Sequence, residues 1–520
     1  MLNFNNRFQR ELPGEADAPN RVRQVAHVCW SGVLPTPVAA PRLIAYSAEM
    51  AASLDLNDAM MQSSEMVSAL AGNTILPGSA PYATRYGGHQ FGNWAGQLGD
   101  GRAILLGAVI NRAGQHWELQ LKGAGPTPYS RGADGRAVLR SSIREFLCSE
   151  AMHHLGIPTT RALSLIETGD KVVRDMFYDG HPAAEPGAIV CRVAPSFTRF
   201  GHFEILAARG ELDLLKQFID FTMSRDFPDL YLQHKKPEER LPAWFSEVCA
   251  RTARMVAEWM RVGFVHGVMN TDNMSILGLT IDYGPYGWVD NFDPGWTPNT
   301  TDAAGKRYCF GRQPEIARWN LERLADALAT VCTDHAALSA CLNVYDEIYS
   351  NESVRIYAGK FGFSAWLDTD AALIGEVFAL MQKAEVDMTE FFRKLAEIDM
   401  ADPSVDVLQS AFYVDALFQQ SRADFAAWLS RYVQRLQHDN RPTTTRIMHM
   451  NQLNPRYVLR NYLAQQAIDK AAAGDASMIH ELLEVMRNPY TVQAGREAFS
   501  AIRPDWARQK AGCSMLSCSS

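Results

Sequence analysis

Residues 117–122 read Trp-Glu-Leu-Gln-Leu-Lys, and this alternation of apolar and polar side chains predicts a strand whose polar face ends in Lys122. After a loop, apolar residues recur at helical spacing over residues 137–155, and Gly156 follows as a stop signal. Such a helix must bury its apolar face against the sheet that carries Lys122. The first part of the chain is therefore predicted to be a small sheet with one packed helix.

Three polar residues further along extend this pattern. Glu145, in the middle of the predicted helix, is the natural partner for Lys122, although most helix glutamates are surface carboxylates. Asn273 and Asp282 follow in the helical part of the chain, each expected at the edge of a short strand pair, where an amide oxygen and a carboxylate can share one Mg²⁺. The order lysine, glutamate, asparagine, aspartate is that of the nucleotide site of protein kinases.

The usual catalytic aspartate of that site is missing. Where a protein kinase reads His-Arg-Asp, this chain reads His-Gly-Val at residues 266–268. Asp272 is the only carboxylate close to the place where a base is needed, and a positioned base contributes on the order of 10² to 10⁴ in rate. Asp272 is expected either to accept a proton or to orient the neighbouring Asn273.

A glycine-rich turn precedes the predicted strand. Gly99 and Gly101 allow a tight turn that brings backbone N–H groups near an anion, and Arg102 adds a positive charge. Taken alone, an ordinary Asp-Gly hairpin is the better interpretation. The lysine that follows favours phosphate binding.

Two arginines add to this charge. Arg192 and Arg199 flank the start of the helical part, and guanidinium groups bind phosphate oxygens bidentately. Together with Lys122 they bring more positive charge to the site than transfer of a terminal phosphate requires. This suggests that the β- and γ-phosphates are bound deep in the site as a leaving pyrophosphate. Surface ion pairs with Glu204 or Glu211 are the alternative.

Composition limits the classes of function. The 520 residues carry a formal net charge of -8, which argues against general binding of nucleic acid or anionic membranes. No apolar run approaches the ~20 residues of a membrane-spanning helix, and the N-terminus does not look like an export signal. The nine cysteines show no metal-site spacing or disulfide density, so a reducing cytoplasm is expected. Cys518, near the C-terminus, is expected to be an exposed thiol open to reversible oxidation.

Several long motifs resemble the selenoprotein O family over essentially the whole chain. They lie at residues 86–92, 97–102, 119–125, 129–131, 134–136, 266–273, 282–285, 454–462 and 518–520. Some members carry a cysteine shortly after the segment corresponding to residues 291–294, able to pair with the C-terminal one. Residues 295–299 contain none, so the resemblance does not extend to that disulfide with Cys518, for which Cys309 and Cys513 are the alternative partners.

The resemblance implies an α+β, protein-kinase-like, two-lobed fold. An N-terminal extension and the N-lobe would span residues 1–195, and the C-lobe with a helical C-terminal extension residues 196–520. It further implies transfer of AMP from ATP, bound in an inverted orientation, to Ser, Thr or Tyr hydroxyls of proteins, with Mg²⁺ or Mn²⁺; UMP transfer is also attributed to the family. The residues that it assigns to the nucleotide are Gly99, Gly101, Arg102, Lys122, Asp134, Gly135, Arg192, Arg199 and Asp282, with Asn273 and Asp282 on the metal and Asp272 as proton acceptor.

Two other functions remain open at this point. An aminoglycoside-kinase-like phosphotransferase also has a His-Gly motif before its metal asparagine, but Val268 stands where its aspartate would be. A catalytically silent, nucleotide-binding pseudokinase scaffold is the second. Retention of Lys122 and of both metal-ligand candidates argues against the scaffold.

Overall fold

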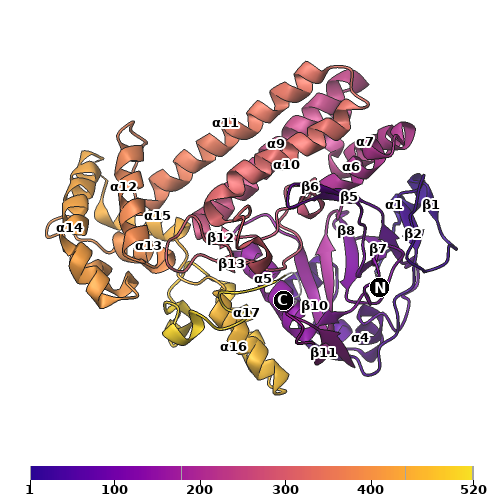
Figure 1. Ribbon diagram of the computed structural model, residues 1–520, viewed down its shortest axis with the longest axis horizontal. Coiled ribbons are helices and arrows are strands. Elements are labelled where there is room, and N and C mark those ends of the chain that lie inside the picture. The colour runs from indigo at the N-terminus through magenta and orange to yellow at the C-terminus, as the bar shows by residue number, and fades with distance from the viewer. Residues whose placement is uncertain (1, 177–178, 440, 518–520) are drawn as a thin grey trace.

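Strands dominate the first 194 residues of the chain and helices dominate the remainder (Figure 1). The structure is a computed structural model that describes residues 2–176, 179–439 and 441–517. The α+β class predicted from the sequence is confirmed. No helix in the described residues has the length and apolar character needed to cross a membrane.

A large mixed sheet carries the predicted lysine strand. Within the described residues its strands run in the order β1-β2-β4-β7-β8-β11-β10-β3, with β9 paired to β11. Strand β8 is antiparallel to both β7 and β11, and this register sets Gln120 opposite Arg192. The strands are β1 (Gly14–Glu15), β2 (Trp30–Gly32), β3 (Arg42–Tyr46), β4 (Tyr82–Thr84), β7 (Ala103–Ile110), β8 (His116–Lys122), β9 (Ala137–Val138), β10 (Arg161–Arg174) and β11 (Ala183–Ala194).

The two faces of this sheet have different partners. On one face Leu119 and Leu121 join a core with Met50 and Leu70 of the N-terminal segment. That segment holds α1 (Arg7–Glu11), α2 (Ala48–Ser53), α3 (Asp58–Met61) and α4 (Ser64–Leu70). On the other face the long helix α5 (Leu139–His154) packs against β10 and β11. The alternation in β8 thus aims Lys122 at α5, as its period of two predicts.

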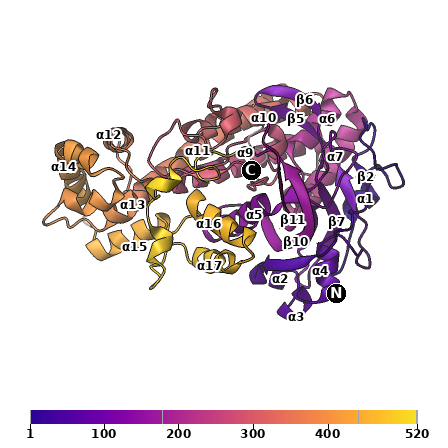
Figure 2. The same cartoon turned by 60° about the horizontal axis from the view of Figure 1, so that its bottom comes forward.

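Helices make up most of the second part. The long helices α9 and α11 lie against each other and against α10, while α12 to α15 form a separate group with its own core, and α16 and α17 return to pack on α5 (Figures 1 and 2). The bounds are α6 (Phe200–Ala208), α7 (Leu212–Asp226), α8 (Pro228–Gln233), α9 (Pro237–Val262), α10 (Gln313–Ala329), α11 (His335–Lys360), α12 (Asp370–Lys383), α13 (Met388–Ala396), α14 (Asp415–His438), α15 (Thr443–Leu453), α16 (Asn461–Ala472) and α17 (Ser477–Met486). The helical C-terminal region predicted from the sequence therefore continues to Met486, and only short 3₁₀ turns follow in the described residues.

The prediction that Asn273 and Asp282 lie at the edge of a short strand pair is wrong. The strands of this region are β12 (Phe264–Val265), which precedes Asn273, and β13 (Gly287–Trp288), which follows Asp282. Asn273 belongs to a 3₁₀ turn, η1 (Thr271–Asn273), and Asp282 lies in a loop with φ of 60°. A backbone in this left-handed region cannot continue a strand, so the chain turns at Asp282.

A separate hairpin, β5 (Gly87–Gln90) and β6 (Asn93–Gln97), lies against η1. Three consecutive residues of the hairpin contact the turn: the His89 N–H donates to Thr271 Oγ1, Gln90 to Asp272, and the Phe91 N–H to Asn270 Oδ1. Because backbone groups make two of these bonds, the hairpin fixes the position of the turn.

Candidate functional site

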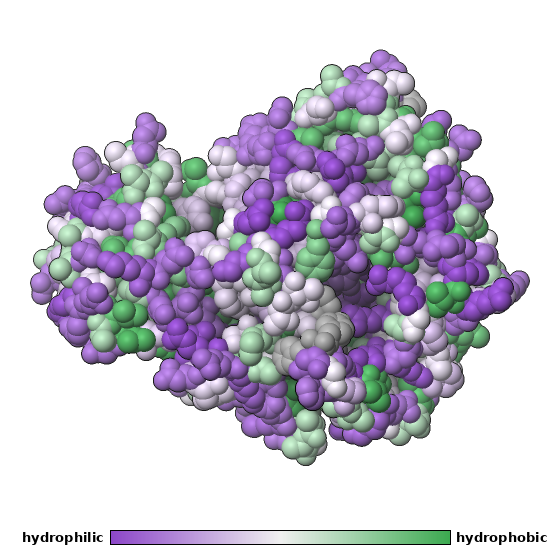
Figure 3. Space-filling model, in the orientation of Figure 1, coloured by the Kyte–Doolittle hydropathy of each residue, from purple (hydrophilic) through white to green (hydrophobic). Residues whose placement is uncertain are grey.

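A cavity of about 570 Å³ brings the predicted site residues together. Figure 3 shows a hollow lined by hydrophilic residues on the face seen in Figure 1. The predicted residues that line the cavity are Gly99, Gly101, Arg102, Lys122, Asp134, Gly135, Arg192, Arg199, Asp272, Asn273 and Asp282. A larger groove of about 780 Å³ between α10 and α11 contains none of them. Residues more than 180 positions apart in the sequence thus share one cavity.

Lys122 and Glu145 form the expected ion pair. Lys122 Nζ lies 2.6 Å from Glu145 Oε2, and the Glu145 side chain is only 4% exposed, so its interpretation as a surface carboxylate is wrong. Burial lowers the pKa of Lys122, and the Glu145 carboxylate opposes that shift. The neighbouring Arg140 pairs instead with Glu185 at the edge of the sheet. The pair therefore holds the lysine in the cavity wall.

The two arginines converge on Asp282. Arg192 Nη1 lies 2.6 Å from Asp282 Oδ1 and 3.2 Å from Glu145 Oε1, and Arg199 Nη1 donates to Asp282 Oδ2. Burial alone would raise the pKa of Asp282, but Arg199, Arg192 and Lys122 hold it well below its usual range. Three cations thus surround two carboxylates, and the site is electropositive.

The alternative surface partners of these arginines are excluded. Glu204 lies 2.5 Å from His89 Nδ1, and both oxygens of Glu211 accept from the buried Arg85. Neither glutamate pairs with Arg192 or Arg199 among the described residues. Both arginines therefore pair with carboxylates at the cavity instead.

Asp272 is a buried carboxylate with one bonded oxygen. Gln90 Nε2 donates to its Oδ2 over 3.1 Å, whereas Oδ1 has no hydrogen-bond partner among the described residues. Burial raises the pKa of Asp272 to about 7, and Gln90 and Arg199 act against this shift. A carboxylate with a pKa near neutrality and one unbonded oxygen suits proton acceptance.

Asp272 does not orient Asn273 in this structure. Asn273 Nδ2 instead donates to the Val268 carbonyl over 2.9 Å. This bond fixes the amide plane and leaves the Asn273 oxygen for another ligand. Both residues still line the same cavity.

The donor set fits a hard divalent cation. Asn273 and Asp282 offer an amide oxygen and an ionised carboxylate, the ligand types that Mg²⁺ and Mn²⁺ prefer. Both Asp282 oxygens are engaged by arginines, so a cation would have to share them. Bound triphosphate would offset this by taking over part of the arginine charge.

The glycine turn is shaped by close packing. A side chain at Gly99 would place its Cβ 2.5 Å from the Tyr129 ring, and one at Gly101 would lie 2.8 Å from the Tyr129 carbonyl oxygen. Gly99 also has φ of 93°. Asp100 between them is buried and accepts hydrogen bonds from Thr84. The hydrogen bonds of Asp100 thus anchor the turn to the protein interior, and the adjoining Arg102 lines the cavity.

Asp134 and Gly135 also line the cavity, Asp134 as an exposed and Gly135 as a buried residue. Asp134 pairs with Arg174 at 2.7 Å. Burial alone would raise the pKa of the Asp134 carboxyl, but Arg174 and the backbone N–H of Arg136 lower it. Gly135 has φ of 69°, and a Cβ there would lie 2.1 Å from the Gly125 carbonyl oxygen. Glycine is therefore required at this position.

Several residues that line the cavity have no role predicted from the sequence. Gln90, Arg131 and Arg136 lie inside motifs that carry the family resemblance, so a signal for them existed, whereas Arg174 gave none. Cys518 lies outside the described residues, and its expected exposure and oxidation stay a prediction.

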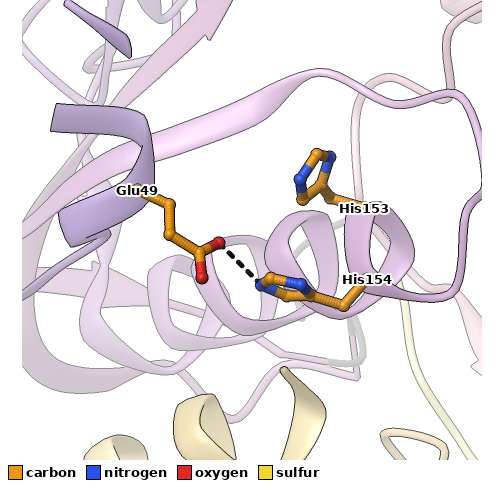
Figure 4. Close-up of side chains that lie close together, drawn as sticks. All are labelled: Glu49, His153 and His154. Carbon is orange, nitrogen blue, oxygen red and sulfur yellow. Dashed lines mark ion pairs between the residues drawn. The ribbon is translucent and has the colours of Figure 1, made fainter. Parts of the chain in front are cut away.

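A second group of polar residues lies at the far end of α5 (Figure 4). Glu49, His153 and His154 place possible ligand atoms within 4.8 Å of one another, with Glu49 Oε2 3.1 Å from His154 Nε2. Arg487 and Arg161 approach the same carboxylate at 3.5 and 3.9 Å. Because these arginines already neutralise Glu49, the group fits an ion-pair cluster better than a metal site.

Comparison with known proteins identifies the family. Residues 16–487 match the family model described as protein adenylyltransferase SelO. The chain is 65% identical over 520 residues to a protein nucleotidyltransferase YdiU of Methylobacillus flagellatus, and 62% identical to proteins of the same name from Tolumonas auensis and Azoarcus sp.. These matches cover all of this chain and 99 to 100% of each relative. The chain therefore belongs to the protein adenylyltransferase SelO family.

Proposed function

We propose that this protein transfers the AMP group of ATP to Ser, Thr or Tyr hydroxyls of other proteins, and UMP from UTP by the same chemistry. The observation that carries the proposal is Asp272: a buried carboxylate with an unbonded oxygen, in a cavity lined by more cations than a terminal phosphate needs. Family membership supports the same reaction class. The proposal includes the protein-kinase-like division into residues 1–195 and 196–520, with the cavity between the two lobes.

In this proposal ATP enters with its triphosphate tail inward. Lys122, Arg192 and Arg199 bind the β- and γ-phosphates, since they form the deepest cationic group of the cavity. Gly99, Gly101 and Arg102 follow along the turn, and Asp134 and Gly135 contact the nucleoside end. The α-phosphorus then faces Asp272.

The transfer step follows from these positions. The acceptor hydroxyl oxygen bonds to the α-phosphorus while the bond from that phosphorus to the β-bridging oxygen breaks. The hydroxyl proton passes to the Asp272 carboxylate, and pyrophosphate leaves with its charge stabilised by Lys122 and the two arginines. Asn273 and Asp282 would hold Mg²⁺ or Mn²⁺, which supplies charge neutralisation at the phosphate oxygens when bound.

Labelled nucleotides test the proposal. With ATP labelled at the α-phosphate, protein should acquire label, and the Asp272→Asn variant should lose most of it. α-Labelled UTP gives the matching test for UMP. Label that reaches protein only from the γ-phosphate would instead identify a phosphotransferase and refute the inverted orientation.

A further inference from the structure

Asn270 presents an unused hydrogen-bond donor to the cavity. The residue lines the cavity and is 4% exposed. Its side-chain oxygen accepts two hydrogen bonds, from the Phe91 N–H and from the Tyr308 hydroxyl. Its Nδ2 has no acceptor in the described part of the chain, yet this nitrogen is not one of the polar atoms that protein seals from solvent without a bond. The N–H groups are therefore free to bond a ligand in the cavity.

The orientation of the Asn270 amide follows from its partners. The Phe91 nitrogen lies 3.2 Å from Oδ1, and because a backbone N–H can only donate, the atom that faces it must be the oxygen. The same N–H also donates to the Tyr308 hydroxyl over 2.9 Å, so the hydroxyl proton is left to bond Asn270 Oδ1 at 2.7 Å. Burial raises the pKa of Tyr308 to about 12, so the hydroxyl keeps this proton near neutral pH. The amide is thus held with Nδ2 away from its two donors.

The groups that hold the amide are themselves fixed. Tyr308 is 1% exposed, and its backbone N–H donates to Asp302 over 2.7 Å. The rings of Tyr308 and Phe91 are in contact, with their centres 5.3 Å apart. The Asn270 carbonyl accepts from the Asn273 N–H over 3.0 Å, and this bond closes the turn η1. A donor held in this way needs no reorganisation when charge develops in front of it.

Asn270 and Asp272 lie close together. The hairpin bonds to both side chains through neighbouring residues, because Gln90 donates to Asp272 Oδ2 and the Phe91 N–H to Asn270 Oδ1. Both side chains therefore lie on the hairpin side of the turn, and both line the cavity. Consecutive Cα atoms are about 3.8 Å apart, so a ligand that contacts the Asp272 carboxylate is within reach of the Asn270 amide.

The two asparagines of this turn offer opposite groups. Asn273 uses its Nδ2 on the Val268 carbonyl and leaves its oxygen free, which suits a cation. Asn270 uses its oxygen and leaves its nitrogen free, which excludes a cation and suits an anionic oxygen. In the proposed reaction, the anion in front of Asp272 is the α-phosphate.

We propose that Asn270 is a further catalytic residue, which donates an N–H to a non-bridging oxygen of the α-phosphate. Lys122, Arg192 and Arg199 bind the other two phosphates and stabilise the leaving pyrophosphate. The Asn270 donor instead stabilises the charge on the α-phosphate oxygens while the acceptor oxygen bonds to the phosphorus. The inference rests on the proposed AMP transfer and adds a residue to its machinery.

ATP with sulfur in place of one non-bridging α-oxygen tests the inference. The analogue exists as two diastereomers, and only one of them places the sulfur, a weak acceptor, against Asn270. The sulfur effect is the loss in kcat/KM relative to ATP. For that diastereomer it should be about tenfold smaller in Asn270→Ala than in wild type, because the variant has no bond left to weaken. For the other diastereomer it should be the same in both proteins.

The kinetics with ATP itself give a second readout. Asn270→Ala should lower kcat by about 10- to 100-fold, the usual effect of losing one donor to a charged transition state. KM for ATP should change by less than about threefold, because the remaining phosphate contacts are untouched.

Two further variants separate this role from a structural one. Asn270→Asp keeps the oxygen that accepts from Phe91 and Tyr308 but lacks the donor, so it should lose the same sulfur effect even if Asn270→Ala is unstable. Asn320→Ala removes a buried amide that donates to the Met269 carbonyl over 3.0 Å and does not line the cavity. It should keep the wild-type sulfur effect with both diastereomers.

The outcomes distinguish the inference from the proposed function. If wild type uses ATP and both diastereomers equally, or if both Asn270 variants keep its sulfur effects, the inference alone is overturned. If wild type transfers no label from α-labelled ATP to protein, the proposed function fails and the inference fails with it.

Discussion

Replacing Glu145 by Gln tests how the cavity wall is held together. Glu145 accepts from Lys122 at 2.6 Å and from Arg192 at 3.2 Å, and the amide keeps the shape of the side chain but removes its charge. In wild type three cations face two carboxylates; in the variant Lys122, Arg192 and Arg199 face Asp282 alone. We expect the free energy of unfolding to fall.

The size of this loss follows from the contacts. Charged hydrogen bonds contribute about 1.5 to 3 kcal/mol each, and Gln retains one acceptor, so the expected loss is about 3 kcal/mol. KM for ATP should rise, because Lys122 is no longer held in place. Glu185→Gln is the matched control: its partner Arg140 is also on α5, but the pair is more exposed, and the expected loss is below about 1 kcal/mol.

Urea unfolding of Glu145→Gln, of Lys122→Met and of the double variant gives the coupling energy between the two residues. We expect about 2 kcal/mol, within the range for residues in direct contact. If the free energy of unfolding of Glu145→Gln lies within about 0.5 kcal/mol of wild type and KM for ATP is unchanged, Glu145 does not hold the cavity wall together.

The remaining predictions concern the base and its surroundings. Asp272→Asn should lower kcat by about 10² to 10⁴ while calorimetry finds ATP binding intact; unchanged kcat would exclude Asp272 as the base. Gly88→Ala should lower kcat about tenfold or more, since its Cβ would lie 2.9 Å from Asp272 Oδ1, whereas Gly375→Ala, with open space around it, should have no such effect. Burial lowers the pKa of His202 to about 3, and its Nδ1 accepts from the Arg199 N–H. Below about pH 6.5 His202 binds a proton in the unfolded chain but stays neutral in the folded chain. The free energy of unfolding should therefore fall by about 3 kcal/mol between pH 6.5 and pH 4. In His202→Asn this part of the acid sensitivity should disappear, and an identical pH dependence would contradict the assignment.

The pair of Lys122 and Glu145 shows how much of the site can be predicted from local sequence patterns. Alternation in one strand and apolar spacing in the next helix assigned Lys122 and Glu145 to neighbouring elements, because each period determines which face of an element is buried. The order of Asn273 and Asp282 further along the chain then favoured their pairing. The same reasoning failed at Asp282, where a positive φ interrupts the expected strand. That conformation is stabilised by Arg192 and Arg199, which are 90 and 83 residues away in sequence.

The class of fold, the order of the charged residues and, through the long motifs, the family can all be read from the sequence. Which charges meet follows from the packing of the chain: Arg192 bridges Glu145 and Asp282, and Gln90 holds Asp272. Periodicity is a property of neighbouring residues and can be read along the chain. Ion pairing depends on distance in space, which the packing of sheet, hairpin and helices sets.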